Sequence, residues 1–260
     1  MRATTGTVTG PRRALALGRA ELTLLGRNRT ALSMTLLMPA LMIYAMRAGA
    51  QQVDLGRSGM SLKEVTMTGA FGYVLIFCVY YNLMSAYTAR REELVLKRLR
   101  TGEAGDLEIL AGTALPSVLI ALVQCVLLVV AGVTWLGMPL PARPELLVAG
   151  VLLGVVVLTA LAAASTAFAR SSESAQLAAM PLAMVSLLGS GIFVPLDLFP
   201  EALARVCEVL PLTGVVQLVR EGWLGGAGAG GVLAHLGAAL VWVGLGVFAV
   251  RRWFRWEPRR

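Results

Sequence analysis

The chain has 260 residues, of which 57% are hydrophobic and only 15% are charged. Its mean hydropathy of +0.74 excludes a soluble domain with an ordinary polar surface. We therefore expect a polytopic membrane protein, and we attribute the net charge of +8 to orientation and to attraction by anionic membrane lipids rather than to nucleic-acid binding.

The amino-terminal 29 residues are predicted to form a cytoplasmic amphipathic segment in the inner headgroup layer, with three leucines on one helical face, Leu15, Leu22 and Leu25. The apolar run that follows precedes Ala48-Gly49-Ala50, which resembles a signal-peptidase site. The run is too long for the apolar part of a leader peptide, and Arg47 lies where small neutral residues are expected. We therefore predict a true membrane span.

Six charge-free runs are long enough to cross a bilayer, since a helical span needs roughly 17–25 apolar residues. The runs are continuous rather than alternating, which favours helices over barrel strands. The predicted fold is therefore an all-α polytopic membrane protein whose permease domain covers residues 30-250. Its spans are predicted at about 30-46, 66-89, 110-135, 146-169, 175-195 and 232-250, before a basic tail at 251-260.

Basic residues gather on one side of the predicted membrane. With the amino terminus inside, 17 of the 23 Lys and Arg residues lie in the amino-terminal segment, in the loop after the second span, at Arg170 or in the tail. Because short positively charged segments stay in the cytoplasm, we predict that both termini are cytoplasmic.

The segment at about 90-108, on the cytoplasmic side, is too charged for lipid. Leucines alternate with charges from Glu92 to Arg100, Glu93 and Lys97 form an i,i+4 pair, and Thr101-Gly102 is a credible helix stop. One interpretation is a docking helix for a soluble partner. The alternative is a solvated loop whose arginines only set topology.

The outer segment at about 196-231 is apolar but interrupted by prolines and charges, so it cannot be one spanning helix. We expect one short helix after Pro200 that ends at Pro211, and a second from Leu212 to Leu224 before a glycine run. We favour a re-entrant hairpin, in which the irregular backbone is buried in protein. A hairpin lying on the outer surface is the alternative.

Polar and aromatic residues also occur inside the predicted spans. Tyr73, Phe77 and Tyr81 recur every four residues beside Asn82, a stripe that could hold an amphipathic substrate but is also explained by packing. Ser186 and Ser190 share a face that favours helix contact, and Gly150 and Gly154 permit close helix packing.

Other chemistry is weakly indicated. The three cysteines Cys78, Cys125 and Cys207 lack paired spacing and His235 is the single histidine, so we expect no metal site. The two lysines, Lys63 and Lys97, do not follow glycine, which excludes a phosphate-binding loop. We therefore expect this chain to bind no cofactor itself.

The chain resembles the membrane subunits of ABC exporters of the type 2 permease family, in particular the small actinobacterial permeases that export drugs or lipids. The resemblance covers nearly the whole chain and rests on the amphipathic start, the six spans, the charged segment Arg91 to Arg100 and the Gly191 to Leu212 stretch. The chain departs from many relatives at Thr101-Gly102-Glu103, where those have a Thr-Pro-like turn.

The resemblance implies a transport subunit rather than an enzyme, in a bacterial cell membrane. It also implies two separate ATP-binding subunits that hold ATP and Mg, and a second permease subunit, with a homodimer favoured over a heterodimer. The substrate would be a hydrophobic or amphipathic drug, lipid or glycolipid, so that antibiotic resistance is a possible role. The second and fifth spans would line its path and the outer segment would close it.

The candidate residues follow from these expectations. Coupling to the ATP-binding subunit is assigned to Glu92, Glu93, Leu94, Leu96, Lys97, Arg98 and Leu99. The outer gate is assigned to Phe193, Pro195, Pro200, Leu203, Val209 and Pro211, and the substrate path to Tyr73, Phe77, Tyr81, Asn82, Ser186 and Ser190.

Two other classes of function fit the sequence. A membrane-embedded enzyme that modifies lipid would use the cluster of acids Glu92, Glu93, Glu103, Asp106 and Glu108. A non-transporting immunity or sensor subunit would have a similar sequence, and only substrate flux would separate it from a transporter.

Overall fold

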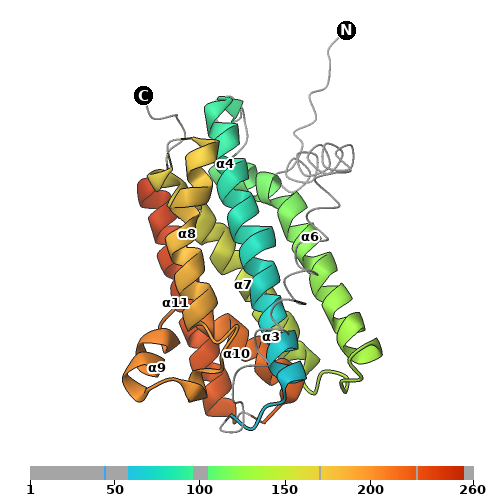
Figure 1. The fold of residues 1–260 in the computed structure, drawn as a ribbon. Coiled ribbons are helices and arrows are strands. Elements are labelled where there is room, and N and C mark those ends of the chain that lie inside the picture. Colours follow the sequence, from blue (N-terminus) through green and yellow to red (C-terminus); the bar gives the residue numbers. More distant parts are fainter. Residues whose placement is uncertain (1–43, 45–57, 96–104, 170, 227, 255–260) are drawn as a thin grey trace.

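The computed structural model describes residues 44, 58–95, 105–169, 171–226 and 228–254. All regular elements within these residues are helical, and the long helices lie side by side in one bundle (Figure 1). The predicted first span and amino-terminal amphipathic helix lie outside the described residues.

A single helix of three consecutive parts runs through the centre of the bundle. It comprises α3 (Leu62–Val74), the π-helix η1 (Leu75–Tyr81) and α4 (Asn82–Glu92). Ser61 and Glu64 form a capping box that satisfies backbone N–H groups at its start. In its most apolar part 78% of the residues are buried, against 17% for the last helix of the chain. We call Leu62–Glu92 the central helix.

Three further helices are long and apolar enough to cross a membrane: α6 (Asp106–Thr134), α7 with the short helix η2 (Pro144–Ser165, Thr166–Phe168) and α11 (Ala229–Trp253). Pro144 opens α7 at a position where a missing N–H has no cost. Large apolar side chains stay exposed on the outer faces of α6 and α11, as lipid contact requires, for example Val126, Leu127, Leu245 and Phe248.

The predicted count of six spans is not confirmed, because the first predicted span falls outside the described residues and the fifth does not qualify as a span. Four helices qualify as spans, and one bent helix pair qualifies only if its halves are taken together. The fifth predicted span, at 175-195, corresponds to α8 (Ser172–Gly189), which does not qualify because polar residues such as Glu173 and Gln176 occupy its first turns. It also ends early, because the chain turns at Gly191, whose φ is +76°.

The bent pair is the segment that connects α8 to α11. After η3 (Leu196–Leu198), α9 (Glu201–Glu208) begins directly after Pro200, and α10 (Thr213–Leu224) ends before the glycine run. The two helices meet at 96°. Most of α10 is buried against α3, α7 and α11, whereas α9 lies on the rim of the bundle (Figure 1).

Glycines allow α10 to approach its neighbours closely. A Cβ at Gly222 would lie 2.7 Å from the Cα of Leu147 in α7, and a Cβ at Gly214 would lie 2.7 Å from the carbonyl oxygen of His235 in α11. In α7, Gly150 lies under Val219 of α10. These contacts involve main-chain atoms, so α10 is held by backbone approach rather than by adaptable side chains.

The ends of the helices fix which segments share a side of the membrane. Tyr87, near the end of the central helix, makes an edge contact with Phe254 after α11, at 6.3 Å between ring centroids. The α9–α10 pair lies at the opposite end of the bundle (Figure 1). The carboxyl terminus of α11 and the start of the charged segment therefore share one side.

This arrangement and the basic-residue count lead to a topology prediction. In a background without the native cysteines, a cysteine at position 203 on α9 should react with a membrane-impermeant maleimide in intact cells, and one at position 258 should react only after permeabilisation. Labelling at 258 together with protection at 203 in intact cells would show that the orientation is inverted.

Candidate functional site

The predicted docking helix does not continue unbroken from the central helix. α4 ends at Glu92, and Leu94 adopts a φ of +58°, a conformation that leucine rarely takes. Its side chain is 40% exposed. The docking segment is therefore not a direct continuation of α4, because the chain turns at Glu93 and Leu94. Leu96, Lys97, Arg98 and Leu99 lie outside the described residues.

Two charged residues at the end of α4 contact the connection between α7 and α8. The Arg91 guanidinium is buried and donates hydrogen bonds to the carbonyl oxygens of Thr166 at 2.9 Å and Ala169 at 2.7 Å. The Glu92 carboxylate accepts a hydrogen bond from the backbone N–H of Ser172 at 3.0 Å. We call Arg91, Glu92 and these three partners the inner joint. Glu93 pairs with Arg90 at 3.4 Å.

The aromatic stripe of the central helix forms a continuous stack. Ring centroids of Tyr73 and Phe77 are 4.3 Å apart, and those of Phe77 and Tyr81 are 5.1 Å apart and nearly parallel. The stack runs through the π-helical part, a backbone form that is rare and frequent at functional sites. Phe77, Tyr81, Asn82 and Ser85 are only partly buried, whereas Tyr73 is buried. We call these four partly buried residues the open stripe, and Tyr73 is not part of it.

Three polar side chains of the central helix form hydrogen bonds inside the bundle. Cys78 contacts Gln124 of α6 at 2.9 Å, and the Tyr80 hydroxyl lies 3.1 Å from that of Ser165 in α7. Asn82 donates to the carbonyl oxygen of Cys78. The Cys78 and Tyr80 contacts tie the central helix to α6 and α7, whereas the Asn82 bond stays within the central helix. Ser186 and Ser190 are buried rather than on the open stripe.

A buried arginine joins three elements at the outer end. Arg220 of α10 donates through Nη2 to the carbonyl oxygen of Gly191 at 2.7 Å, and its Nε lies 3.4 Å from the hydroxyl of Thr68 in the central helix. The next residue, Glu221, lies 2.9 Å from the His235 imidazole of α11. Arg220 therefore links α10 to the end of α8 and to the central helix.

The residues assigned to the outer gate fall into two groups. Pro195 and Pro211 are buried and Phe193 is partly buried, whereas Pro200, Leu203 and Val209 are exposed. The exposed group belongs to α9 and its ends, where Trp242 of α11 donates to the carbonyl oxygen of Val209 at 2.8 Å. The gate residues therefore do not form one cluster.

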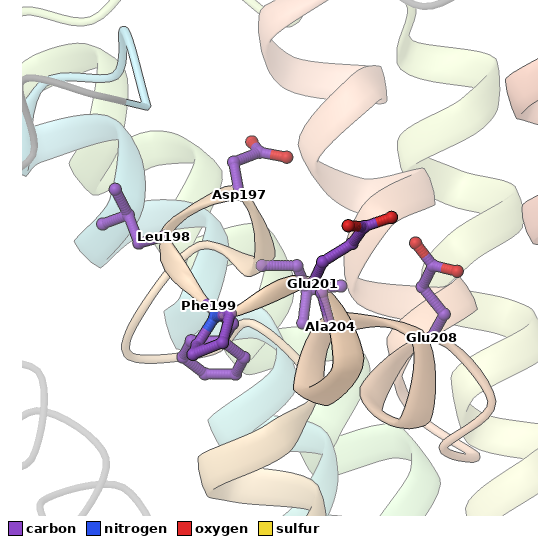
Figure 2. A pocket seen from close by; sticks show the side chains of 8 residues that line it. Asp197, Leu198, Phe199, Glu201, Ala204 and Glu208 are labelled. Carbon is purple, nitrogen blue, oxygen red and sulfur yellow. The ribbon is translucent and has the colours of Figure 1, made fainter.

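A pocket of about 510 Å³ opens between η3 and α9. Figure 2 shows the Asp197, Glu201 and Glu208 carboxylates around it, with Leu198, Phe199 and Ala204 in its wall. Arg205 forms an ion pair with Glu201. Within the residues that the structure describes, no group of three His, Cys, Asp or Glu side chains is placed to hold a metal ion.

The sequence also matches a known protein family. The sequence model described as ABC-2 type transporter matches residues 12–224. The chain belongs to the ABC-2 type transporter family. No curated protein matches it.

Family membership establishes the general class of this chain. An ABC-2 transporter chain is a multi-pass membrane protein and the permease component of an ABC transporter, working with an ATP-binding subunit and generally carrying no ATP-binding motif of its own. The matched range contains the inner joint, the central helix and the α9–α10 pair, and it ends with α10.

Sequence reasoning missed the two buried arginines of this ABC-2 permease. From the sequence, Arg91 belongs to the charged segment and Arg220 is one of the basic residues outside the cytoplasmic groups. In the structure Arg91 donates to two main-chain carbonyl groups of other elements and Arg220 donates to one. A signal was present for Arg220, because it lies in the apolar stretch Thr213–Leu224, where a charged residue suggests a specific role. No comparable signal marks Arg91, which lies among other charges.

Proposed function

We propose that this ABC-2 permease is the membrane subunit of a bacterial exporter that moves a hydrophobic or amphipathic drug, lipid or glycolipid outward. Two permease chains, as a homodimer, assemble with two ATP-binding subunits that hold ATP and Mg. The proposal rests on the contacts at the two ends of the central helix. At its inner end Arg91 contacts the α7–α8 connection, and near its outer end Thr68 contacts Arg220 of α10.

The inner end is the proposed site of contact with the ATP-binding subunit. Leu94 is exposed in a left-handed conformation that costs roughly 1–2 kcal/mol. A strained residue persists only where its surroundings enforce it, and such residues gather at functional positions. The Leu94 side chain is therefore the proposed apolar anchor, and Lys97 and Arg98 form the charged rim.

The open stripe of the central helix is the proposed substrate path. Phe77 and Tyr81 offer stacked rings, and Asn82 and Ser85 add polar groups beside them. Rings with polar edges suit a substrate that has both apolar and polar parts. In the homodimer, the stripes of the two chains would face each other across the path.

The outer end is the proposed closing element. α10 is buried and approaches α7 and α11 closely at glycine residues. This burial favours a re-entrant segment that closes the path from within the bundle over a hairpin that lies on the surface. α9 then covers the rim, with Leu203 and Val209 directed away from the chain's own core. Proposed closure therefore depends on α10, and α9 provides an apolar edge.

Association with an ATP-binding subunit tests the proposed function. This chain should co-purify with one ABC ATP-binding subunit among those of its source cell, beginning with any encoded beside it, and should alter that subunit's rate of ATP hydrolysis. If no ATP-binding subunit associates in native membranes or detergent, the proposed exporter is wrong. Hydrolysis or modification of lipid by the purified chain alone would favour the enzyme.

A charge on α9 should impair transport. Leu203→Arg and Val209→Arg place a cation on the apolar edge, and we expect each to lower transport at least about tenfold at equal expression, because desolvating a charge is costly. Leu140→Arg is the control, since Leu140 is 72% exposed in the α6–α7 connection at the same end. Equal transport by all three variants would show that α9 has no part in closure.

A further inference from the structure

The two charges of the inner joint are matched to opposite ends of two helices. The Arg91 guanidinium meets the carbonyl oxygens of Thr166 and Ala169, where α7 and η2 end and the helix partial charge is negative. The Glu92 carboxylate meets the N–H of Ser172, the first residue of α8, where the partial charge is positive. Two neighbouring residues of α4 thus form hydrogen bonds to two different elements, the end of α7 with η2 and the start of α8.

The contact between α8 and α4 combines packing with a hydrogen bond at the first residue of α8. α8 packs against α4, and its buried residues include the small side chains Ala175, Ala179 and Ala183, whereas Leu177, Met184 and Leu188 are exposed. Alanine side chains let the two helices approach closely but form no hydrogen bonds between them. The hydrogen bond from Ser172 to Glu92 is therefore a directional link between these two helices at that end.

We propose that Arg91 and Glu92 are positioning residues that transmit a displacement of the turn at Glu93 and Leu94 to α8. The inference rests on the proposed function. Arg91 holds the end of α7 with two bonds from one planar group, which fixes the pivot. Glu92 holds the start of α8 with one bond, so a shift of the turn at Leu94 moves α8 relative to α7.

The outer end of α8 receives that movement. The chain turns at Gly191 just after α8, and Arg220 of α10 donates to the Gly191 carbonyl oxygen at 2.7 Å. A displacement that starts at Glu92 therefore reaches the buried helix α10 through main-chain atoms at both ends of α8. ATP that binds to the partner subunit can shift the membrane helices only through a contact that differs between two conformations.

A proline at position 172 removes the link without an unfavourable change to the helix. Ser172→Pro deletes the N–H that donates to Glu92, at the first helical position, where proline is favoured. The preceding residue, Ser171, has φ −133° and ψ 165°, which suits a residue before proline. Ser172→Ala keeps the N–H and is the matched control.

The readout is the movement of α8 when ATP binds. Leu188, exposed on α8, is replaced by cysteine in a background without Cys78, Cys125 and Cys207 and labelled with an environment-sensitive fluorophore. The complex with a hydrolysis-deficient ATP-binding subunit is then titrated with ATP and Mg. We expect an emission shift in the parent and in Ser172→Ala, and loss of most of that shift in Ser172→Pro at unchanged co-purification.

A double-mutant cycle separates transmission from general destabilisation. Glu92→Ala should also lose the shift, and Glu92→Ala with Ser172→Pro should lose no more than either change alone, because both remove the same bond. An equal shift in the parent and Ser172→Pro, or additive losses in the cycle, would overturn the inference while the complex still stands. A parent that binds no ATP-binding subunit would overturn the proposed function as well.

Discussion

Leu94→Asp is expected to abolish binding of the ATP-binding subunit while the permease still inserts and folds. An apolar anchor at the centre of an interface contributes about 2–4 kcal/mol, so association should weaken at least about thirtyfold, enough to prevent co-purification. Folding should be unaffected, because Leu94 is 40% exposed and contributes little to the chain's own core. The measurement is the amount of ATP-binding subunit that co-purifies, with thermal stability of the permease measured in parallel.

Two further substitutions at the same position sharpen this test. Leu94→Gly removes the strain of φ +58° and should raise or preserve stability, yet it also removes the anchor. Leu94→Met keeps an apolar side chain and should retain partner binding. Full binding by the Asp and Gly variants would exclude Leu94 as an anchor and would leave the solvated-loop interpretation of the segment.

Gly222→Ala is expected to disturb the outer end strongly. The added Cβ would lie 2.7 Å from the Cα and 2.8 Å from the Cβ of Leu147, so α10 or α7 must shift. Overpacking of this kind costs about 1–3 kcal/mol, which corresponds to a fall in thermal midpoint of about 3–10 °C. Transport should be lost even at temperatures at which the variant is still folded, because α10 is the proposed closing element.

Gly228→Ala provides the matched control. Gly228 precedes α11 at the same end of the bundle, its φ is −69°, and nothing lies within 4 Å of its Cβ position. We expect a thermal midpoint and transport close to those of the parent. A Gly222→Ala protein with the stability and transport of the parent would mean that the close contact between α10 and α7 is unimportant.

The long apolar helices could be predicted from the sequence because the membrane selects for uninterrupted apolar runs. The second, third, fourth and sixth predicted spans overlap the four qualifying helices. The two helices between Pro200 and the glycine run could also be predicted in outline, because proline and glycine restrict the backbone at their own positions. Composition and apolar runs predicted a polytopic membrane protein, whereas the permease family was indicated only by the resemblance.

Other features could not be predicted, because they depend on contacts between distant segments. An uncharged run does not reveal that α8 ends at Gly189, since the turn at Gly191 is stabilised by Arg220 from another helix. A pattern of leucines and charges does not reveal the turn at Leu94. Nor does a count of basic residues distinguish Arg91, which is buried against two carbonyl groups, from arginines that only orient the chain.

ATP-driven transport in proteoliposomes tests the central claim most directly. The permease and its ATP-binding subunit are reconstituted together, and movement of Hoechst 33342 and of a fluorescent phospholipid is followed after addition of ATP and Mg. We expect movement of at least one probe away from the side of the ATP-binding subunit, and none with a hydrolysis-deficient subunit or with Leu94→Asp. Movement that proceeds equally without ATP, or ATP hydrolysis that moves neither probe, would contradict an exporter of hydrophobic or amphipathic substrates.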